Sequence, residues 1–326
     1  MRPSGAHCLK RSRRRLLPSS QAQPPSPAPP PEAAPSPRCR PPEPSLPERI
    51  RAHYDRLTPL YSLVWGEHIH HGYWDTGDAG GGTPEEAQER LIRLLAGKAE
   101  LARCGRVLDI GCGIGGSSRW LAENLGCQVL GVTISHVQAV LASRAGASPA
   151  KRTKSATGNA AFIQADAARL PVGEASFDAV WIVECAEHLD DKRGLMHSLA
   201  AALRPGGVLA MCGWFRGEIL PPDHTENELA PLLDGMLLPS LATISNTAEW
   251  IEEGGLSISH KLDITERVSR TWDLCLDIAR RPLARLLLPR LDDDARRFVG
   301  SFEMMKSAYQ SGAMRYALIT ARRPAG

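Results

Sequence analysis

Short runs of apolar residues alternate with segments of helical periodicity through the middle of the chain. A short apolar run bounded by glycine or polar residues predicts a buried strand, whereas apolar residues three or four apart predict a helix with one buried face. We therefore expect strands over 106–110, 128–133, 160–164 and 178–183, and helices over 116–125, 136–145 and 191–203. Strands that alternate with helices predict an α/β fold with a doubly wound parallel sheet.

Flanking segments extend this pattern on both sides. Thr83-Pro84-Glu85-Glu86 combines a capping hydroxyl, a proline in the first turn and a glutamate three residues after the cap, which predicts a helix start. Arg204-Pro205-Gly206-Gly207 predicts the end of the helix over 191–203, and the apolar VLAMC that follows predicts a strand. Further on we expect a helix capped at Thr247 and ending at Gly254, a strand over 257–263, helices around 270–305 and a last strand from Tyr316 to Ala321.

Residues 1–45 are rich in proline and arginine and differ from the rest of the chain. Their first acidic residue is Glu32, and the prolines prevent a packed core, so we expect a disordered tail. An arginine-bearing start without acids is also typical of an organelle targeting segment. We therefore expect a cytoplasmic protein, or one of the plastid or another organelle if the segment is a transit peptide.

Composition argues against several other classes of protein. Basic residues cluster in the first fifteen positions and account for the net charge of +3, so no nucleic-acid partner is predicted. The chain has no run of eighteen apolar residues, hence no predicted transmembrane segment. Eight cysteines without a C-x-x-C pair predict free thiols in a reducing compartment. His68, His70 and His71 lack partners that would complete a metal shell, so we expect no metal.

The stretch VLDIGCGIGGSSRW, from Val107 to Trp120, leads from the first predicted strand through four glycines into a helix. Glycine permits positive φ and a close approach of ligand to backbone, and a helix N-terminus attracts polar groups. We therefore expect a nucleoside-binding loop formed by Gly111, Cys112, Gly113 and Gly115. Gly111, Gly113 and Gly116 also fit the G-x-G-x-x-G spacing of dinucleotide-binding folds, so the glycines alone leave both kinds of ligand open.

Two positions favour S-adenosylmethionine over a nicotinamide nucleotide. Asp109 would repel a pyrophosphate but can accept hydrogen bonds from the cationic amino-acid end of S-adenosylmethionine. Thr133 and Ile134 follow the second strand, where an NAD enzyme would offer Asp or Glu to the ribose. We interpret the chain as a methyltransferase. The alternatives are an NAD(P)-dependent oxidoreductase, a glycine turn that binds nothing, and a methyltransferase fold that serves only as a binding protein.

Acidic residues and a histidine follow the third and fourth predicted strands. Asp166 can accept a hydrogen bond from an adenine amino group, with Ala167 offering its backbone, or it can cap a helix. Glu184, Glu187 and His188 are the catalytic candidates, because a nucleophile that carries a proton requires a base and histidine titrates near neutral pH. Glu187 can instead begin the next helix, and His188 can be a structural histidine.

An aromatic segment precedes the glycine loop. The aromatic residues are Tyr54, Tyr61, Trp65, Tyr73 and Trp74. Their rings can lie near the cationic sulfur of S-adenosylmethionine and exclude water from it, or they can simply pack a helix against the rest of the fold. We predict one methyltransferase domain over 46–326, made of an N-terminal lid (46–82), a donor-binding core (83–213) and an acceptor-binding cap with the last strands (214–326).

Six motifs stand in the order found in the gamma-tocopherol methyltransferase family: HYDRLTPLYSLVWGEHIHHGYW, VLDIGCGIGGSSRWLA, GVTISHVQ, QADAARLP, FDAVWIVECAEHLDDK and LRPGGVLAMCGW. Over roughly residues 50–323 the chain resembles this branch of the class I S-adenosylmethionine-dependent methyltransferases. The resemblance implies a Rossmann-like, mostly parallel seven-stranded sheet with an N-terminal helical lid and a helical cap insertion. It also implies that Asp109, Gly111 and Gly113 hold the methionine part of the donor, Thr133, Ile134 and Gln138 the ribose, and Asp166 with Ala167 the adenine, beneath the tyrosines and Trp65.

The sequence restricts the acceptor only loosely. Members of this family and more distant relatives methylate prenylated phenol rings, alkaloid nitrogens, sugar hydroxyls, or the nitrogen of glycine or sarcosine, and the fold does not choose among them. Cys185-Ala186 stands where many members have Ser-Gly, which bears on the acceptor pocket. We expect a small apolar acceptor, and peripheral membrane contact if it is a lipid. This expectation rests on leucines that can equally belong to the core: Leu232, Leu233, Leu237, Leu238 and Leu286 to Leu288.

Overall fold

The computed structural model describes residues 44–75, 82–101, 105–146, 158–222, 225–290 and 292–326. By its internal contacts the chain divides into two units, Met1–Glu43 and Pro44–Gly326, and every described residue belongs to the second. The predicted tail and targeting segment therefore lie almost entirely outside the described residues.

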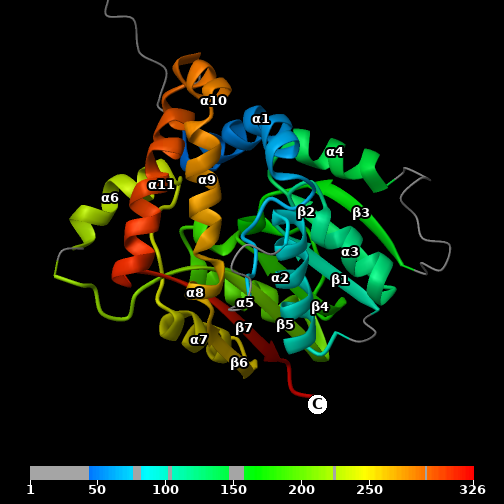
Figure 1. The fold of residues 1–326 in the computed structure, drawn as a ribbon. Helices are drawn as coiled ribbons and strands as arrows, with labels where there is room; N and C mark the ends of the chain where they lie inside the picture. Colours follow the sequence, from blue (N-terminus) through cyan, green and yellow to red (C-terminus); the bar gives the residue numbers. More distant parts are fainter. Residues whose placement is uncertain (1–43, 76–81, 102–104, 147–157, 223–224, 291) are drawn as a thin grey trace, which may run out of the picture. The chain divides into compact units, whose positions relative to one another are not determined.

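One seven-stranded sheet forms the centre of the second unit (Figure 1). The strand order is β3-β2-β1-β4-β5-β7-β6, in which β7 is antiparallel to both neighbours and the remaining pairs are parallel. The strands are β1 (Arg106–Ile110), β2 (Gln128–Thr133), β3 (Asn159–Gln164), β4 (Phe177–Val183), β5 (Leu203–Arg216), β6 (Ser257–Asp263) and β7 (Met314–Arg322). The predicted mostly parallel, seven-stranded sheet is confirmed.

Helices cover both faces of the sheet. Along β4, Ala179 and Trp181 belong to one hydrophobic core cluster and Val180 and Ile182 to another, because successive side chains of a strand point to opposite faces. Helices α2 and α3 contribute to the first cluster, and α5 and α7 to the second. These helices and α4 are α2 (Pro84–Lys98), α3 (Gly116–Leu125), α4 (His136–Gly146), α5 (Lys192–Ala202) and α7 (Ile244–Glu253).

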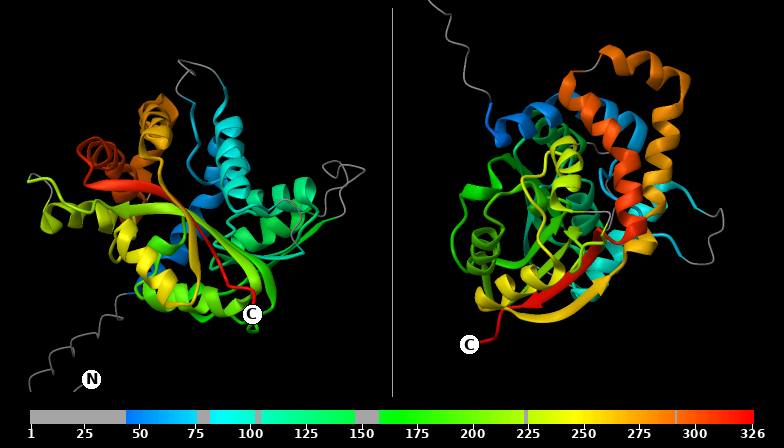
Figure 2. Two further views of the ribbon diagram at one scale, coloured as in Figure 1. Left: turned by 90° about the horizontal axis from the view of Figure 1, so that it is seen from below. Right: turned by 90° about the vertical axis from the view of Figure 1, so that its left-hand side faces the viewer.

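The N-terminal helical lid and the helical cap insertion are both present (Figures 1 and 2). Helix α11 contacts α1, α6 and α9, so the lid and the cap form one layer. Arg49 of α1 donates a 3.0 Å hydrogen bond to Asp294 of α11. The elements are α1 (Leu46–Trp65), η2 (Ala167–Arg169), η3 (Ala186–His188), α6 (Glu226–Gly235), α8 (Thr265–Val268), α9 (Arg270–Arg280), α10 (Pro282–Leu287), η4 (Leu288–Arg290) and α11 (Asp293–Ser311).

Two predicted boundaries differ from the structure. The helix ends at Ala202, close to the predicted end, but strand β5 already begins at Leu203, which pairs with β4. Residues 204–207 therefore bulge out of the ladder within the strand instead of preceding it. Helix α7 is capped by Thr243, whose side chain accepts a hydrogen bond from the backbone N–H of Asn246, and not by Thr247. The buried Thr247 hydroxyl donates to the Thr243 carbonyl, so it lies inside the helix.

The cysteines follow the prediction only in part. Cys112, Cys185, Cys212 and Cys275 are free. Cys127 is disulfide-bonded, so the prediction that all thiols are free is wrong. Spacing does not show which thiols a fold brings together.

Two features, a membrane-spanning helix and a cluster of metal ligands, are absent from the described ranges. No helix there has the length and apolar character needed to cross a bilayer. Those ranges also contain no group of three His, Cys, Asp or Glu side chains arranged to hold a metal.

Candidate active site

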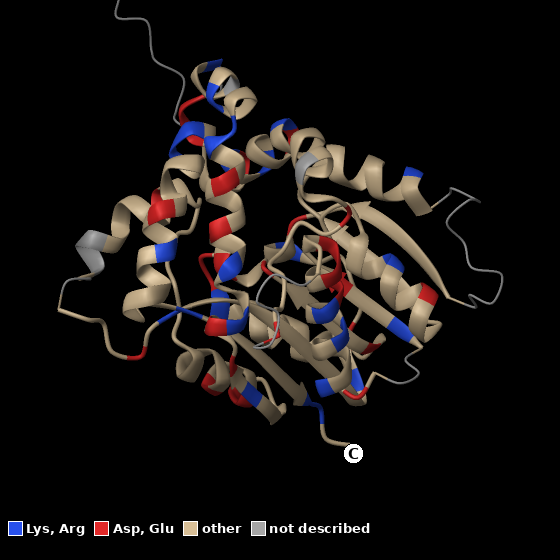
Figure 3. Ribbon diagram, viewed as in Figure 1, with Lys and Arg blue, Asp and Glu red and all other residues tan. Residues whose placement is uncertain are grey.

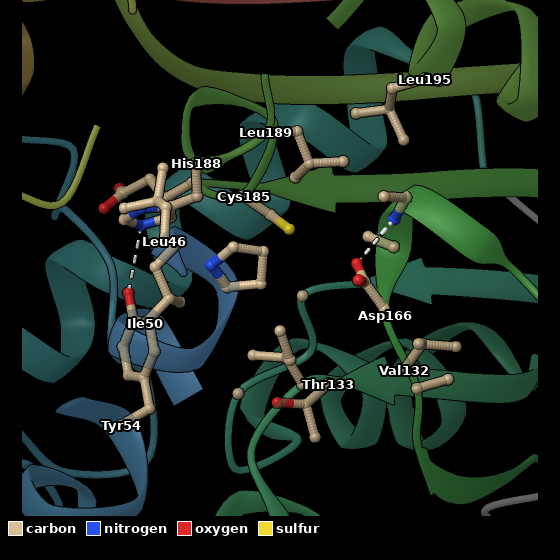
Figure 4. Close-up of a pocket in the computed structure, with 18 of the residues that line it drawn as sticks. Leu46, Ile50, Tyr54, Val132, Thr133, Asp166, Cys185, His188, Leu189 and Leu195 are labelled. Atoms are coloured by element: carbon tan, nitrogen blue, oxygen red, sulfur yellow. Dashed lines mark hydrogen bonds between the residues drawn. The ribbon is translucent and has the colours of Figure 1, made fainter. Parts of the chain in front are cut away.

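A cavity of about 390 Å³ opens at the carboxyl ends of β1, β2, β3 and β4 (Figure 4). The strand order reverses between β1 and β4, which is where open α/β sheets bind ligands. The cavity is enclosed by the glycine loop, the segments after β2, β3 and β4, one face of α1 and the start of α5. The fold therefore brings together segments that are far apart in the sequence.

The three glycines of the loop have different surroundings. Gly111, Gly113 and Gly115 all adopt positive φ, at 72°, 55° and 80°. A Cβ on Gly111 would lie 2.6 Å from the Cys185 sulfur, and one on Gly115 would meet the ring of Phe162 at 2.5 Å. A Cβ on Gly113 would meet no protein atom within 4 Å. Gly111 and Gly113 line the cavity, whereas Gly115 allows α3 to pack against β3.

Asp109 lies beneath the loop, not in the wall of the large cavity. It is buried and accepts a hydrogen bond from the Ser118 hydroxyl. Burial raises the pKa of Asp109 to about 7, and the hydrogen bond from Ser118 opposes this. Asp109 and Cys112 line a second cavity of about 30 Å³ that adjoins the first. Burial raises the pKa of the Cys112 thiol, which keeps it protonated and unreactive.

Residues that follow β2 and β3 form the opposite wall of the large cavity. Thr133, Ile134 and Gln138 all line it, and the Thr133 hydroxyl donates a 2.6 Å hydrogen bond to Gln138 Oε1. Asp166 and Ala167 also line it. The Asp166 carboxylate accepts a 2.9 Å hydrogen bond from the backbone N–H of Ala168 and so caps η2, while it still faces the cavity (Figure 4). Capping and ligand binding are therefore compatible at Asp166.

Two of the three glutamate and histidine candidates after β4 line the cavity, and Glu187 does not. Glu184 lines it, with φ of +49°, and its carboxylate accepts hydrogen bonds from the His71 backbone N–H (2.7 Å) and the Tyr316 hydroxyl (2.8 Å). Burial raises the pKa of Glu184. The charge and hydrogen bonds of His71 together outweigh this effect, so the pKa of Glu184 lies below its usual value. Glu187 is buried against β5 and accepts a hydrogen bond from the Trp214 backbone, and burial raises its pKa to about 8.

His188 lines the cavity and is held on both ring nitrogens. Its Nδ1 lies 3.1 Å from the Leu237 carbonyl, and its Nε2 lies 3.3 Å from the Tyr54 hydroxyl (Figure 4). A carbonyl only accepts, so Nδ1 carries the proton and Nε2 accepts from Tyr54. Burial lowers the pKa of His188, which keeps the imidazole neutral. The Nε2 lone pair thus lies at the cavity wall, where it accepts from the Tyr54 hydroxyl.

Only one of the three aromatic candidates on α1 reaches the cavity. Tyr54 lines it together with Leu46 and Ile50, which the sequence analysis did not single out. Spacing of four residues places all three on one helix face and is the signal that was available. Tyr61 and Trp65 do not line the cavity: the Tyr61 hydroxyl lies 2.9 Å from His53 Nε2, and the indole N–H of Trp65 donates to the His70 carbonyl.

Helix α1 is also fastened to the segment that follows β2. The Asp55 carboxylate accepts hydrogen bonds from the Ser135 hydroxyl (2.6 Å) and the Val137 backbone N–H (3.1 Å) at the start of α4. This contact fixes α1 over the segment that contains Thr133 and Ile134. The predicted lid thus covers one side of the cavity.

Comparison with known proteins decides between a methyl donor and a nicotinamide nucleotide. A family model described as a methyltransferase domain matches residues 108–211. A probable chloroplastic tocopherol O-methyltransferase of Oryza sativa subsp. japonica is 30% identical over 86% of this chain and 79% of its own length. The chain belongs to the class I S-adenosylmethionine-dependent small-molecule methyltransferases related to the tocopherol methyltransferases.

Two further relatives show the breadth of this methyltransferase family. The 27-O-demethylrifamycin SV methyltransferase of Amycolatopsis mediterranei is 30% identical over 85% of this chain and 98% of its own length. The crystal structure of the [4+2]-cyclase SpnF superposes with a TM-score of 0.73 at 25% identity, covering 87% of this chain and 98% of that one. The methyltransferase fold thus accommodates different acceptors and reactions, so the fold alone does not identify the acceptor.

Proposed function

We propose that this methyltransferase methylates a small, uncharged, apolar acceptor such as a tocopherol-like phenol. The charge of the cavity carries the proposal. Its wall contains Asp166, Glu184, Asp190 and Asp191, and none of the described residues that line it is Lys or Arg. A buried carboxylate or phosphate needs a cationic or strongly hydrogen-bonding partner. The acidic wall suits a sulfonium donor and an uncharged acceptor, and it disfavours glycine or sarcosine, which carry a carboxylate.

The residues of the cavity fit the donor. Gly113 leaves open space that a Cβ would occupy, so a ligand can approach the backbone there. We assign the adenosine to the wall formed by Thr133, Gln138 and Asp166, because hydroxyl, amide and carboxylate groups match a ribose and an adenine amino group. When bound, the donor supplies an electrophilic methyl group. The protein's own contribution is then to align the acceptor and to take up its proton.

His188 is the base in this proposal. Its lone pair on Nε2 faces the Tyr54 hydroxyl, and an acceptor hydroxyl that takes the place of Tyr54 would donate to the same nitrogen. The Leu237 carbonyl fixes the ring so that Nε2 is always the accepting nitrogen. The acceptor hydroxyl would give its proton to His188 Nε2 while its oxygen, or the ring carbon that it activates, takes the methyl group and S-adenosylhomocysteine leaves. A methylated ring carbon would then lose its own proton, and the ring oxygen would regain a proton to restore the hydroxyl.

The test is transfer of a labelled methyl group from S-adenosylmethionine to a panel of acceptors: γ-tocopherol, a simple prenylated phenol, glycine and sarcosine. We expect label in the phenols only. His188→Ala should lower turnover about 100-fold or more, while S-adenosylhomocysteine affinity stays unchanged in calorimetry. Label in glycine or sarcosine without label in any phenol would refute the proposal.

We also propose that the lid and cap dock on a membrane that holds the acceptor. Large apolar side chains are exposed on α10, where Leu283 is 66% and Leu286 60% exposed, and near the end of α1, where Leu63 is 84% exposed. Arg281 and Arg285 are exposed on and beside α10, where Figure 3 shows a group of Lys and Arg residues in blue. Exposed leucines flanked by arginines suit an anionic lipid surface. The chloroplastic relative supports a plastid location for the chain.

A further inference from the structure

Lys192 is a buried cation at the start of a helix. It is the first residue of α5 and is only 7% exposed. Burial lowers the pKa of Lys192 to about 8, although the charges of Glu187 and Asp190 act in the opposite direction. The dipole of α5 also disfavours a cation at the N-terminus of the helix. Neither burial nor helix stability therefore explains why this position holds a lysine.

The ammonium group of Lys192 donates to two uncharged groups. One is the Leu189 carbonyl, at 2.6 Å, and the other is the Ser240 hydroxyl, at 3.2 Å. The first contact is local, whereas the second joins residues 48 positions apart. Ser240 belongs to the segment between α6 and α7, residues 236–243, which we call the 236–243 loop. Lys192 thus ties the start of α5 to this loop.

The same loop holds the proposed base. His188 Nδ1 donates to the Leu237 carbonyl, and this hydrogen bond determines that Nδ1 carries the proton. The backbone N–H of Leu237 donates to the Asp234 carbonyl, and its φ is +56°, so it stands just past the end of α6 in a conformation that favours glycine. A leucine keeps such a strained backbone only where surrounding contacts hold it.

Two neighbouring hydrogen bonds therefore connect the 236–243 loop to the segment that follows β4. His188 pairs with Leu237 across 49 positions, and Lys192 pairs with Ser240 across 48. The nearly equal separations mean that the loop and the segment 188–192 run side by side. The two side chains of this segment also interact electrostatically: burial is the main cause that lowers the pKa of His188, and the charge of Lys192 lowers it too.

We propose that Lys192 is a positioning residue for His188. By tying the 236–243 loop to the start of α5, it keeps the strained Leu237 carbonyl on Nδ1, so that Nε2 is the nitrogen that takes up the acceptor's proton. Lys192 does not line the large cavity, so it acts through His188 and not on the ligands. This inference rests on the proposed role of His188 as the base.

The tautomer of His188 tests the proposal directly. In ¹⁵N NMR of histidine-labelled protein at pH 8, with His188→Ala to identify the signals, wild type should show a protonated Nδ1 and a bare Nε2. Lys192→Met should move part of the population to a protonated Nε2. It should also lower kcat about 10-fold or more, while S-adenosylhomocysteine affinity in calorimetry stays within about twofold of wild type. Lys192→Arg keeps a cationic donor and should restore the tautomer.

Ser240→Ala separates the tie from the charge of Lys192. Ser240 is exposed, so the loss of its hydroxyl spares the core, and the cation remains. We expect the tautomer to shift in the same direction as in Lys192→Met. Lys261→Met is the matched control, because Lys261 is exposed on β6, and it should change neither the tautomer nor kcat.

Three results would overturn the proposal: an unchanged tautomer in both variants, a shift in Lys192→Met alone, which would leave only a charge effect, or a shift without any fall in kcat. If Lys192→Met fails to fold by circular dichroism, Ser240→Ala carries the comparison with the control. The tautomer is measured without an acceptor. Failure to methylate any phenol would therefore refute the proposed acceptor and leave the tie between Lys192 and the loop to be judged from the NMR result.

Discussion

Gly113 shows how a single residue shapes the proposed donor site. Its φ of +55° is a conformation that side-chain-bearing residues rarely adopt, and the direction of its missing Cβ leads into open space beside both cavities. Gly111 and Gly115 have positive φ as well, but their missing Cβ atoms face Cys185 and Phe162. A positive φ alone therefore does not show whether a glycine faces a ligand or only allows two protein segments to pack closely.

Gly113→Val should abolish measurable donor binding, because its branched side chain enters the space that the donor needs. The measurement is S-adenosylhomocysteine affinity by calorimetry, with a loss of about 100-fold or more expected. Gly206→Val is the control, since Gly206 has φ of +77° and also meets nothing within 4 Å, but lies in the β5 bulge away from the cavities. It should lower stability through the same backbone strain and leave affinity intact. Unchanged affinity in the Gly113 variant would contradict the site.

At the scale of elements, α1 connects the two halves of the site. Asp55 fastens it to the start of α4, and Arg49 fastens it to Asp294 of α11. Tyr54, between these two contacts, reaches His188. The lid therefore contacts the proposed donor wall, the proposed base and the cap together. Its capping box at Ser45 and Glu48 explains where the helix begins.

Helix α10 provides the element-level test of membrane docking. Leu283→Ser combined with Leu286→Ser should reduce cosedimentation with vesicles that contain anionic lipid about tenfold, because the apolar contact with the bilayer is lost. Methylation of a detergent-dispersed acceptor should not change. Ile219→Ser is the matched control, since Ile219 is 87% exposed on a different segment. Equal effects of the control and the double variant would argue against a specific docking face.

At the scale of the molecule, buried ionisable groups oppose one another. Burial lowers the pKa of His53 to about 4 and that of His68 to about 3, so these residues reduce stability as pH falls below the normal histidine range. Burial raises the pKa of Asp109 to about 7 and that of Glu187 to about 8, so these two reduce stability as pH rises. These four groups together favour the folded state most at mildly acidic pH, between the usual pKa ranges of carboxyl and histidine side chains.

Glu187→Gln should stabilise the protein at pH 9 and have little effect at pH 5. The folded pKa of about 8 exceeds the unfolded value, so wild type loses stability as pH rises through 8, and the amide removes that loss while it still accepts from Trp214. One unit of pKa shift corresponds to about 1.4 kcal/mol, so a gain of roughly 2–4 kcal/mol is expected in urea unfolding at pH 9. Glu249→Gln is the control, because Glu249 is exposed, and its stability relative to wild type should not depend on pH. If Glu187→Gln raised the free energy of unfolding equally at pH 5 and pH 9, the raised pKa of Glu187 would not be the cause.

The sequence by itself determined the features that depend on near neighbours. Alternating apolar runs predicted the parallel strands, the Thr83 capping box predicted the start of α2, and the glycine loop with Asp109 and Thr133 predicted the methyl donor. These features can be predicted from the sequence because each depends on residues within about ten positions. They are the periodicity of a strand, the cap of a helix and the positive φ of a glycine.

Only the tertiary structure decided which side chains meet. The Tyr54–His188 contact joins residues 134 positions apart, and the Glu184–His71 contact joins residues 113 apart. Burial decided that Glu187 faces β5 and that Asp109 lies in the smaller cavity. Such contacts depend on how the lid, the sheet and the cap pack, because that packing sets the distance, the burial and therefore the protonation of each group.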